Sequence, residues 1–229
     1  MQNRLVLAID NSLDFLNIAL SREDVLLDER HIAPHKPPSQ SIPGEALRIL
    51  ADHDHHIDEV SLIIATIGPG SFTGIRVGLA FCKGVASGRN IPLVGVPTLD
   101  VLASPLSFME GHYLCPLIDA RKGEVFAALY FVSHGSVERL TDYRALKPID
   151  VPSMLQTPCL CFGTGINICA DTLSSLDNTQ LIRKGFSRIS GEQLIREGLR
   201  QKEQGAGCDL KPIYGRRSEA EIKFGVKVI

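Results

Sequence analysis

Two stretches of the sequence repeat one pattern of strands and turns. The first reads LVLAID, NSLD and FLNIALS, and the second reads LCPLID, ARKG and EVFAALYF. In each, an apolar strand ends in Ile-Asp and a short turn leads into a second strand, so that Asp10 and Asp119 hold corresponding places. Short links make neighbouring strands antiparallel. A repeat on the order of a hundred residues indicates duplicated domains rather than a solenoid.

Each half of the predicted fold continues through further strands and helices. In the first half, a third strand at 25–32 precedes a helix capped near Ser41, the apolar strand VSLIIATI, a long helix and the strand PLVGV. A continuously apolar strand is typical of burial on both faces beside a parallel neighbour. In the second half we expect a third strand around 137–143, a helix near Pro152, the strand CLCFG, a helix from about Asn167 and the strand QLIRK. Two copies of β-β-β-α-β-α predict a duplicated α/β fold with mixed sheets.

The expected domains follow from this duplication. We place an N-terminal domain at 1–103 and a second, smaller domain at 104–189. Residues 190–229 open with SGEQLIREGLRQKEQG, whose serine and closing glycine predict a capped helix. We expect this helix and the tail after it to complete the first domain.

The turn GPGSFTG joins the buried strand VSLIIATI to the long helix. It does not match the Walker A loop, because Gly74 is followed by Ile75 and Arg76 rather than by lysine. It does not match the dinucleotide fingerprint either, because the spacing from Gly70 to Gly74 is one residue too long. Two interpretations stay open: Ser71 or Thr73 caps the helix, or the exposed amides attract an anion.

The helix predicted from Thr73 to Gly88 carries apolar or very small residues over most of its circumference. A helix that covers one sheet needs an apolar arc of only about 100°. Small residues recur at four-residue spacing, as Gly74 with Gly78 and as Ala80 with Gly84 and Gly88, which lets another backbone approach closely. We infer that one side packs on its own sheet and the other on a second surface, either another helix of the same chain or another molecule. The helix beginning near Ser41 is expected as its neighbour in either case.

Composition and charge limit the function classes. The net charge of −2 and the lack of a basic stripe argue against unaided binding of nucleic acid. No apolar run is long enough to cross a bilayer, and the N-terminus lacks the pattern of a signal peptide. Six cysteines without a CxxC motif are typical of reduced thiols in a cytoplasmic protein. Cys159 and Cys161 share one face of an apolar strand, where core packing is favoured over a redox or metal role.

Several blocks resemble, in order, the TsaB (YeaZ) family of bacterial tRNA threonylcarbamoyladenosine biosynthesis proteins. These blocks are LAIDNS, IGPGSFTGIRVGLAFCKGVA, GVPTLDVLA, LIDARKGEVFAALY and PIYGRR. The resemblance implies two actin/RNase H-like domains and a non-catalytic subunit. It also implies pairing with the catalytic paralogue TsaD, together with the ATPase TsaE, for transfer of threonylcarbamoyl to N6 of adenosine 37 of tRNA. Binding of tRNA would then occur only through the complex, and ATP or ADP at the partner interface is left open.

The same resemblance implies that helices of the N-terminal domain form the partner surface, which a homodimer uses when the chain is alone. On this sequence the matching helix faces carry mostly apolar or small residues. We expect the surface to include Leu47, Leu50, Gly74, Val77, Gly78, Ala80, Phe81, Gly84, Val85 and Gly88. No catalytic, cofactor-binding or metal-binding residue is expected in this chain.

The residues themselves also argue against catalysis. After Asp10 the chain lacks the glycine of the D-x-G-x-T turn that actin-like kinases use for nucleotide. The histidine cluster HDHH, from His53 to His56, has no H-x-x-x-H spacing, and a solvated helix end is favoured there over a metal site. An actin-like ATP-dependent small-molecule kinase or ATPase and a metallopeptidase-like protein remain the alternative functions.

The hairpin DARKGEV has two interpretations. Gly123 is predicted at a positive-φ position at its tip. Its charges either form a solvated turn or line a cleft between the domains. The residues that would line this cleft are Asp10, Asp119, Arg121 and Glu124.

Overall fold

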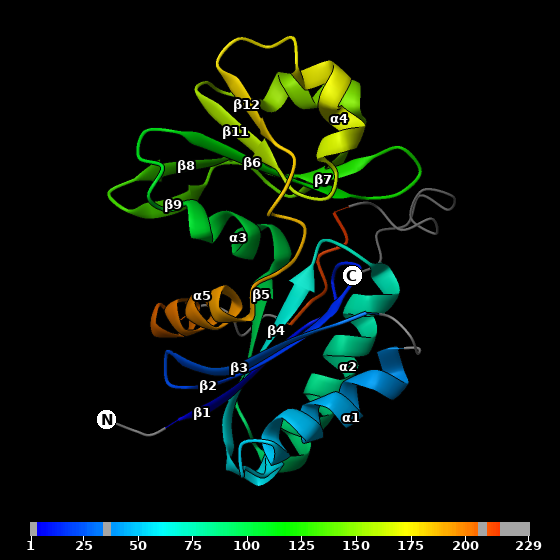
Figure 1. Cartoon of the computed structure of the whole chain (residues 1–229), viewed down its shortest axis with the longest axis vertical. Helices are drawn as coiled ribbons and strands as arrows, with labels where there is room; N and C mark the ends of the chain where they lie inside the picture. The colour runs from blue at the N-terminus through cyan, green and yellow to red at the C-terminus, as the bar shows by residue number, and fades with distance from the viewer. Residues whose placement is uncertain (1–3, 34–37, 206–209, 216–229) are drawn as a thin grey trace.

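The chain forms two α/β halves stacked along the long axis of the molecule (Figure 1). The computed structural model describes residues 4–33, 38–205 and 210–215. The first half contains strands β1 to β5 and lies at the bottom of Figure 1, and the second contains strands β6 to β12. The predicted duplication of a mixed α/β unit is therefore confirmed.

The first sheet has the strand order β3-β2-β1-β4-β5. Its strands are β1 (Leu5–Asp10), β2 (Leu16–Arg22), β3 (Val25–Ile32), β4 (Val60–Gly68) and β5 (Leu93–Pro97). The three strands of the meander pair antiparallel, whereas β4 lies parallel to both β1 and β5. The buried apolar strand VSLIIATI thus has the parallel neighbours that its composition predicted.

The second sheet repeats this arrangement along its main path, β10-β7-β6-β11-β12. Its strands are β6 (Tyr113–Asp119), β7 (Val125–Ala127), β8 (Tyr130–Ser133), β9 (Ser136–Arg139), β10 (Arg144–Leu146), β11 (Cys159–Phe162) and β12 (Thr179–Ile182).

The strand EVFAALYF was predicted as continuous, but the structure divides it into β7 and β8. β8 pairs with the start of β6 and β7 with its end. Pro116 lies between these two stretches of β6 and has no N–H to donate. Leu129, between β7 and β8, bonds instead to the segment after β9, since its amide donates to Thr141 Oγ1 at 2.9 Å. The expected third strand at 137–143 is accordingly replaced by β9, which pairs with β8, and β10, which pairs with β7.

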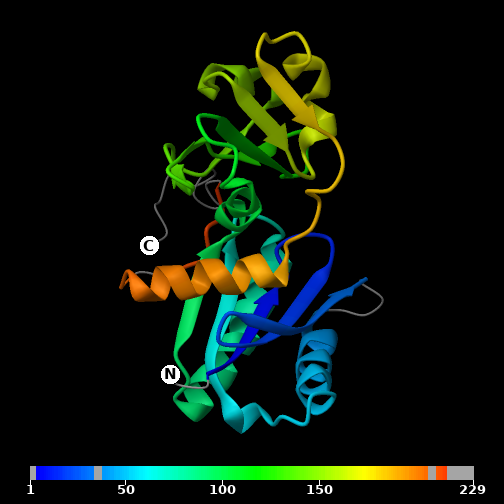
Figure 2. The same cartoon turned by 60° about the vertical axis from the view of Figure 1, so that its left-hand side comes forward.

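Helices cover both faces of the first sheet (Figures 1 and 2). Helices α1 (Pro38–Ala51) and α2 (Phe72–Arg89) lie on one face, and α5 (Gly191–Glu203) crosses the other. Helix α3 (Thr98–Ala103) follows β5, and α4 (Ile166–Leu173) covers the second sheet. Short 3-10 segments occupy Ile57–Glu59, Ser104–Leu106 and Pro148–Met154.

Two predicted helix details are wrong. The first helix begins at Pro38, so Ser41 lies inside it rather than at its cap. Proline is favoured in the first turn, because an amide there has no intrahelical acceptor. The helix expected near Pro152 is a 3-10 segment, Pro148–Met154, and Pro152 inside it has no N–H to donate to an α-helical hydrogen bond.

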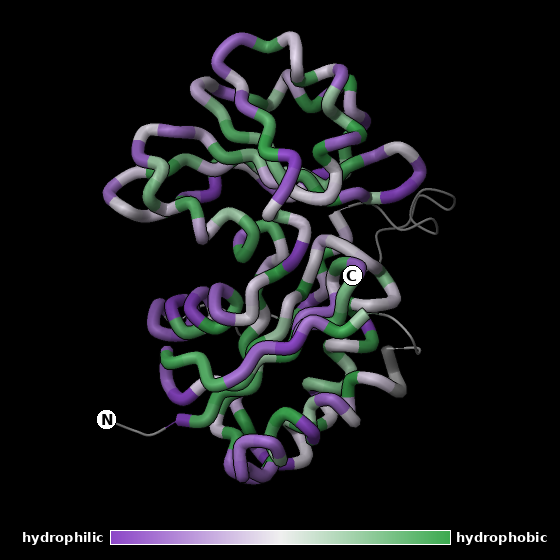
Figure 3. The backbone as a smooth tube through the Cα atoms, in the orientation of Figure 1, coloured by the Kyte–Doolittle hydropathy of each residue, from purple (hydrophilic) through white to green (hydrophobic). Residues whose placement is uncertain are grey.

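Side chains on the first sheet alternate between two cores. On β1, Leu7 and Ile9 pack with α1 and α2, whereas Val6 and Ala8 pack on the side of α3 and α5. The central strands of both sheets are largely hydrophobic in Figure 3. A third core, beneath α4, contains Cys115, Cys159, Cys161 and Cys169, as expected for packing thiols.

The segment from residue 210 to 215 crosses between the two halves. The amide of Ile213 donates to the carbonyl of Ile67 at 2.7 Å. The amide of Ala145 donates to the carbonyl of Gly215 at 2.8 Å. Gly68 has a φ of +99° and lies so close to the carbonyl of Ile213 that a Cβ would clash. The expected tail lies partly outside the described residues, and the domain boundaries stay a prediction.

Candidate functional site

Asp10 ends β1 with its side chain buried in the first half. Its Oδ1 accepts hydrogen bonds from the amide and hydroxyl of Ser12 and from Thr66 Oγ1, the last at 2.7 Å. Burial raises the pKa of Asp10 above its usual value, although these hydrogen bonds favour the charged form. The carboxylate therefore joins the β1–β2 turn to β4, and it does not line the cleft described below.

Asp119 ends β6 in the corresponding place of the second half. Its Oδ1 accepts from the amide of Arg121 at 2.7 Å, and its own amide donates to Thr164 Oγ1 at 3.0 Å. Each aspartate thus accepts from the amide of the residue two positions later in the chain. Each also contacts a threonine of the neighbouring parallel strand connection: Thr66 lies in β4, and Thr164 follows β11. Asp119 differs in that about 30% of its side chain is exposed. Gly123, at the tip of the hairpin, has the predicted positive φ, +75°.

The glycine turn before α2 packs against the β1–β2 turn. The amide of Ser71 donates to the carbonyl of Ser12 at 2.7 Å, and Ser71 Oγ caps α2 by accepting from the amide of Gly74 at 3.2 Å. The Asn11 side chain donates to the carbonyl of Gly74 at 3.1 Å. Capping by Ser71 is therefore one function of the turn, and contact with the first strand connection is another.

A cleft of about 580 Å³ lies between the two halves. Of the four residues named for the cleft interpretation of the hairpin, Asp119 and Arg121 lie in its wall, whereas Asp10 and Glu124 are not among the described residues of the wall. The guanidinium of Arg121 reaches Asp14 Oδ1 across the cleft at 3.0 Å. The wall consists of Ser12, Leu13, Asp14, Gly70, Ser71, Phe72, Thr73, Ile118, Asp119, Ala120, Arg121, Phe126, Thr164 and Tyr214.

Phe72 and Tyr214 were not expected in this wall. Their ring centroids lie 4.9 Å apart, and the guanidinium of Arg76 lies 3.9 Å from the centre of the Phe72 ring. Tyr214 belongs to the PIYGRR block, but its contact with α2 depends on the path of the chain after α5. Sequence spacing carries no signal for such a contact.

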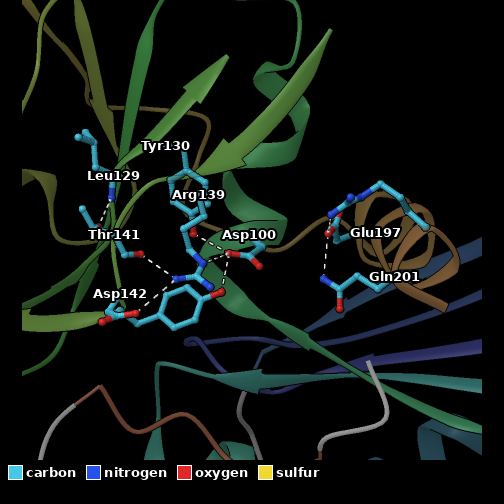
Figure 4. A network of polar contacts seen from close by, with 10 residues as sticks. Asp100, Leu129, Tyr130, Arg139, Thr141, Asp142, Glu197 and Gln201 are labelled. Carbon is cyan, nitrogen blue, oxygen red and sulfur yellow. Dashed lines mark hydrogen bonds and ion pairs between the residues drawn. The ribbon is translucent and has the colours of Figure 1, made fainter. Parts of the chain in front are cut away.

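A polar network joins α3 to the second sheet beside α5 (Figure 4). Asp100 Oδ1 accepts from the hydroxyls of Tyr130 at 2.7 Å and Tyr143 at 2.8 Å. Burial raises the pKa of Asp100. Across from it, Glu197 on α5 accepts from Arg200 and Gln201. Since α3 connects the two halves in sequence, this network holds the connection against the second sheet.

Helices α1 and α2 pack side by side, and part of their outward surface is apolar. Gly84 and Gly88 on α2 are exposed, and a Cβ built on either would meet no atom within 4 Å. Ala80 is also exposed, and Leu47 on α1 is 54% exposed. Val77, Phe81 and Val85 are half-buried against the core between the first sheet and helices α1 and α2. We call these seven residues the α1/α2 face.

Leu50, Gly74 and Gly78 were expected on the partner surface, but the structure buries all three. Leu50 packs in the core beneath α1. Gly74 lies against the carbonyl of Asn11, and a Cβ at Gly78 would lie 3.7 Å from the Asn11 side chain. The glycine spacing at the start of α2 therefore serves contact within the chain, which a helical wheel does not distinguish from contact with a partner.

The histidine cluster before β4 forms separate pairs with carboxylates. His53 Nε2 lies 3.3 Å from Asp28, and His55 Nδ1 lies 2.7 Å from Glu59. Within the described ranges, no group of three or more histidines, cysteines and acidic residues is placed to hold a metal ion. No helix in the described part of the chain combines the length and apolar character needed to span a bilayer.

Comparison of the sequence with known proteins gives consistent matches. The family model of TsaD, the tRNA N6-adenosine threonylcarbamoyltransferase, matches residues 34–156. The tRNA threonylcarbamoyladenosine biosynthesis protein TsaB of Bacillus subtilis is 30% identical over 227 residues, which cover 96% of this chain and 97% of that protein. TsaB of Escherichia coli is 30% identical over 126 residues, covering 55% of this chain and 54% of that protein.

Comparison of the structure agrees with the fold. The structure of YeaZ from Pseudomonas aeruginosa superposes with a TM-score of 0.75 at 21% identity, covering 92% of this chain and 99% of that one. At this identity the match supports the arrangement of the two α/β halves and no finer property.

Proposed function

Because the chain belongs to the TsaB family of tRNA threonylcarbamoyladenosine biosynthesis proteins, we propose that it is a non-catalytic subunit that pairs with TsaD through the α1/α2 face. The family places the chain in threonylcarbamoyladenosine biosynthesis as a relative of TsaD. Pairing would position TsaD, with TsaE as a further partner, for transfer of threonylcarbamoyl to N6 of adenosine 37. The tRNA would be bound by the complex in the cytoplasm.

The openness of the α1/α2 face carries this proposal. Gly84 and Gly88 expose backbone on the outside of an 18-residue helix, and each glycine inside a helix costs about 0.8–1 kcal/mol relative to alanine. Flat, weakly polar helix surfaces of this kind let a second helix approach closely. The same face would support a homodimer when TsaD is absent.

The geometry of Asp10 supports a non-catalytic role over an actin-like kinase or ATPase. Its Oδ1 accepts from three donors within the chain and its side chain is buried. A carboxylate that acts on a bound nucleotide must instead reach the cleft. The separate histidine pairs likewise give no support to a metallopeptidase-like activity.

Light scattering coupled to size-exclusion chromatography tests the pairing. We expect the unaltered chain and TsaD to elute as a heterodimer, and the Gly84→Leu variant to bind TsaD at least tenfold more weakly, because leucine would hold the facing helix away. The substitution exposes no buried group, so the isolated variant should fold at least as stably as the original.

Asn167→Leu is the matched control, since it places the same side chain on an exposed position of α4 in the second half. This variant should bind TsaD normally. Equal binding by both variants, with circular dichroism showing folded proteins, would refute the proposed surface. Failure of the unaltered chain to bind TsaD would refute the proposed partner.

A further inference from the structure

Helices α1 and α2 carry an excess of positive charge, although the net charge of the whole chain is −2. They contain one acidic residue, Glu45, and the basic residues Arg48, Arg76, Lys83 and Arg89. Arg48 pairs with Glu45 at 2.6 Å. Arg89 pairs with Asp58, which precedes β4, at 2.7 Å. The excess on these helices therefore comes from Arg76 and Lys83.

Arg76 and Lys83 have polar contacts within the chain but no carboxylate partner. Arg76 Nε donates to the Tyr214 hydroxyl at 2.9 Å, and Lys83 Nζ donates to the carbonyl of Leu210 at 3.3 Å. Both residues are exposed, and within the described ranges no aspartate or glutamate pairs with either of them. A guanidinium has five N–H donors and an ammonium has three, so both groups keep donors for a further acceptor.

These two cations border the α1/α2 face. They lie seven residues apart on α2, which is about 10 Å along the helix axis and nearly on the same side of the helix. Ala80 and Ser87 are exposed on this side as well, and Ala80 also belongs to the α1/α2 face. The face thus combines an apolar area of small residues with two positive charges along its border.

We propose that this border selects an acidic partner. The surface of TsaD that packs on the α1/α2 face carries carboxylates opposite Arg76 and Lys83, and these charges favour TsaD over a second copy of this chain. This selection rests on the pairing with TsaD proposed above. Carboxylates seven residues apart on a facing helix would match the spacing of the two cations. Opposite charges across an interface speed association and disfavour unsuitable partners.

A second copy of the chain is the less suitable occupant of the face. In a two-fold symmetric homodimer the same surface meets itself. The cations of both copies would then enter one interface, where the two helices offer only Glu45, which already pairs with Arg48. Like charges brought together in an interface cost free energy and act against the wrong partner. The homodimer should therefore be weaker than the heterodimer at low salt.

An RNA backbone matches this face less well than an acidic protein surface. Proteins that bind nucleic acid through its phosphates make several such contacts, on the order of 6–10. Here two cations border an apolar area, which offers a phosphate no donor. A protein surface with an apolar centre and an acidic border matches both parts of the face.

Charge reversal at Lys83 tests this selection, because Lys83 is exposed and glutamate is a good helix former. We expect Lys83→Glu to weaken the binding of TsaD by about fivefold or more at about 0.1 M salt, measured by calorimetric titration. The loss should shrink at about 1 M salt, since the Debye length falls from about 10 Å to about 3 Å. Without TsaD, light scattering should show more homodimer for this variant than for the unaltered chain.

Lys184→Glu is the matched control, since it reverses the charge of an exposed lysine that follows β12. This variant should bind TsaD like the unaltered chain. Lys83→Gln separates the charge from the contact with Leu210, because glutamine can still donate to that carbonyl. Its affinity for TsaD should lie between those of the unaltered chain and Lys83→Glu. Circular dichroism checks that each variant is folded.

The proposed selection would be overturned by equal losses in Lys83→Glu and Lys184→Glu, or by tighter binding of TsaD to Lys83→Glu. Unchanged binding of TsaD together with weaker binding of tRNA by the complex would assign the cations to RNA and overturn it as well. If Gly84→Leu weakens the binding of TsaD and Lys83→Glu does not, the acidic partner surface is refuted and the pairing stands. Failure of the unaltered chain to bind TsaD would refute both.

Discussion

The two halves share a strand order but differ in the helix that follows the central parallel strand. In the first half, β4 leads through Ser71 into the 18-residue α2, whereas in the second half β11 leads through Gly163, Thr164 and Gly165 into the eight-residue α4. The aspartates that end β1 and β6 also differ in burial, because Asp10 is buried and Asp119 is partly exposed.

This difference shows which surfaces the two copies of the duplicated unit leave exposed. In the first half the start of α2 packs against Asn11, whereas Gly84 and Gly88 near the other end of the helix meet open space. In the second half the short helix covers its own core, and the exposed aspartate turn faces the cleft. The open helix surface therefore belongs to the first half, whereas both halves line the cleft.

Substitution of the two aspartates should give the largest contrast. Asp10→Ala removes the acceptor of three buried donors and should lower the free energy of unfolding by about 3 kcal/mol or more, since each orphaned donor costs about 1–3 kcal/mol. Asp119→Ala should cost about 1 kcal/mol, because water can replace its oxygen. Urea unfolding followed by circular dichroism measures both, and equal losses would contradict the comparison.

Two glycines of α2 should respond in opposite directions. A Cβ at Gly74 would collide with the backbone carbonyl of Asn11, so Gly74→Ala should destabilise the chain by about 1–3 kcal/mol. Gly84→Ala meets open space and should stabilise it by up to about 1 kcal/mol. Thermal unfolding distinguishes the signs, and destabilisation by Gly84→Ala would mean that the outward surface is covered.

The pH dependence of stability should reveal the buried carboxyl of Asp10. Its folded-state pKa is raised by burial, so its contribution to stability is complete below the unfolded pKa and is lost as pH rises through the folded pKa. Asp10→Asn keeps the accepting Oδ1 but does not ionise. The variant should therefore gain stability relative to the original chain as pH rises from about 4 upward. Urea unfolding at several pH values tests this, and a constant difference would contradict the buried charge.

The smallest effect is expected for the ion pair that joins the halves. Asp14 and Arg121 are both mostly exposed, with 67% and 73% of their side chains accessible. Exposed pairs contribute about 0.2–1 kcal/mol, so Asp14→Ala should change the free energy of unfolding by less than about 1 kcal/mol. A larger loss in urea unfolding would show that the halves depend on this contact for their packing.

Much of the fold was accessible from local patterns. The repeat around Asp10 and Asp119, the parallel strand β4 and the cap at Ser71 all depend on neighbouring residues, and the structure contains each of them. The division of EVFAALYF into β7 and β8 was not predicted, because it depends on the neighbouring strand β6, in which Pro116 has no N–H to donate. The predicted start of the first helix at Ser41 and the predicted α-helix near Pro152 were both wrong. In both places a proline is compatible with more than one helical position or type, so local sequence does not decide between them.

The sequence by itself determined the duplication and the excess apolar surface of α2, because both depend on the spacing of residues along the chain. Its sequence blocks carried the resemblance to the TsaB family. Only the tertiary structure decided that Gly74 and Gly78 face Asn11 while Gly84 and Gly88 face outward. It also decided that Phe72 meets Tyr214, and that Arg121 of one half meets Asp14 of the other. These contacts join residues more than a hundred positions apart or choose between faces of one helix, and such choices depend on how whole elements pack.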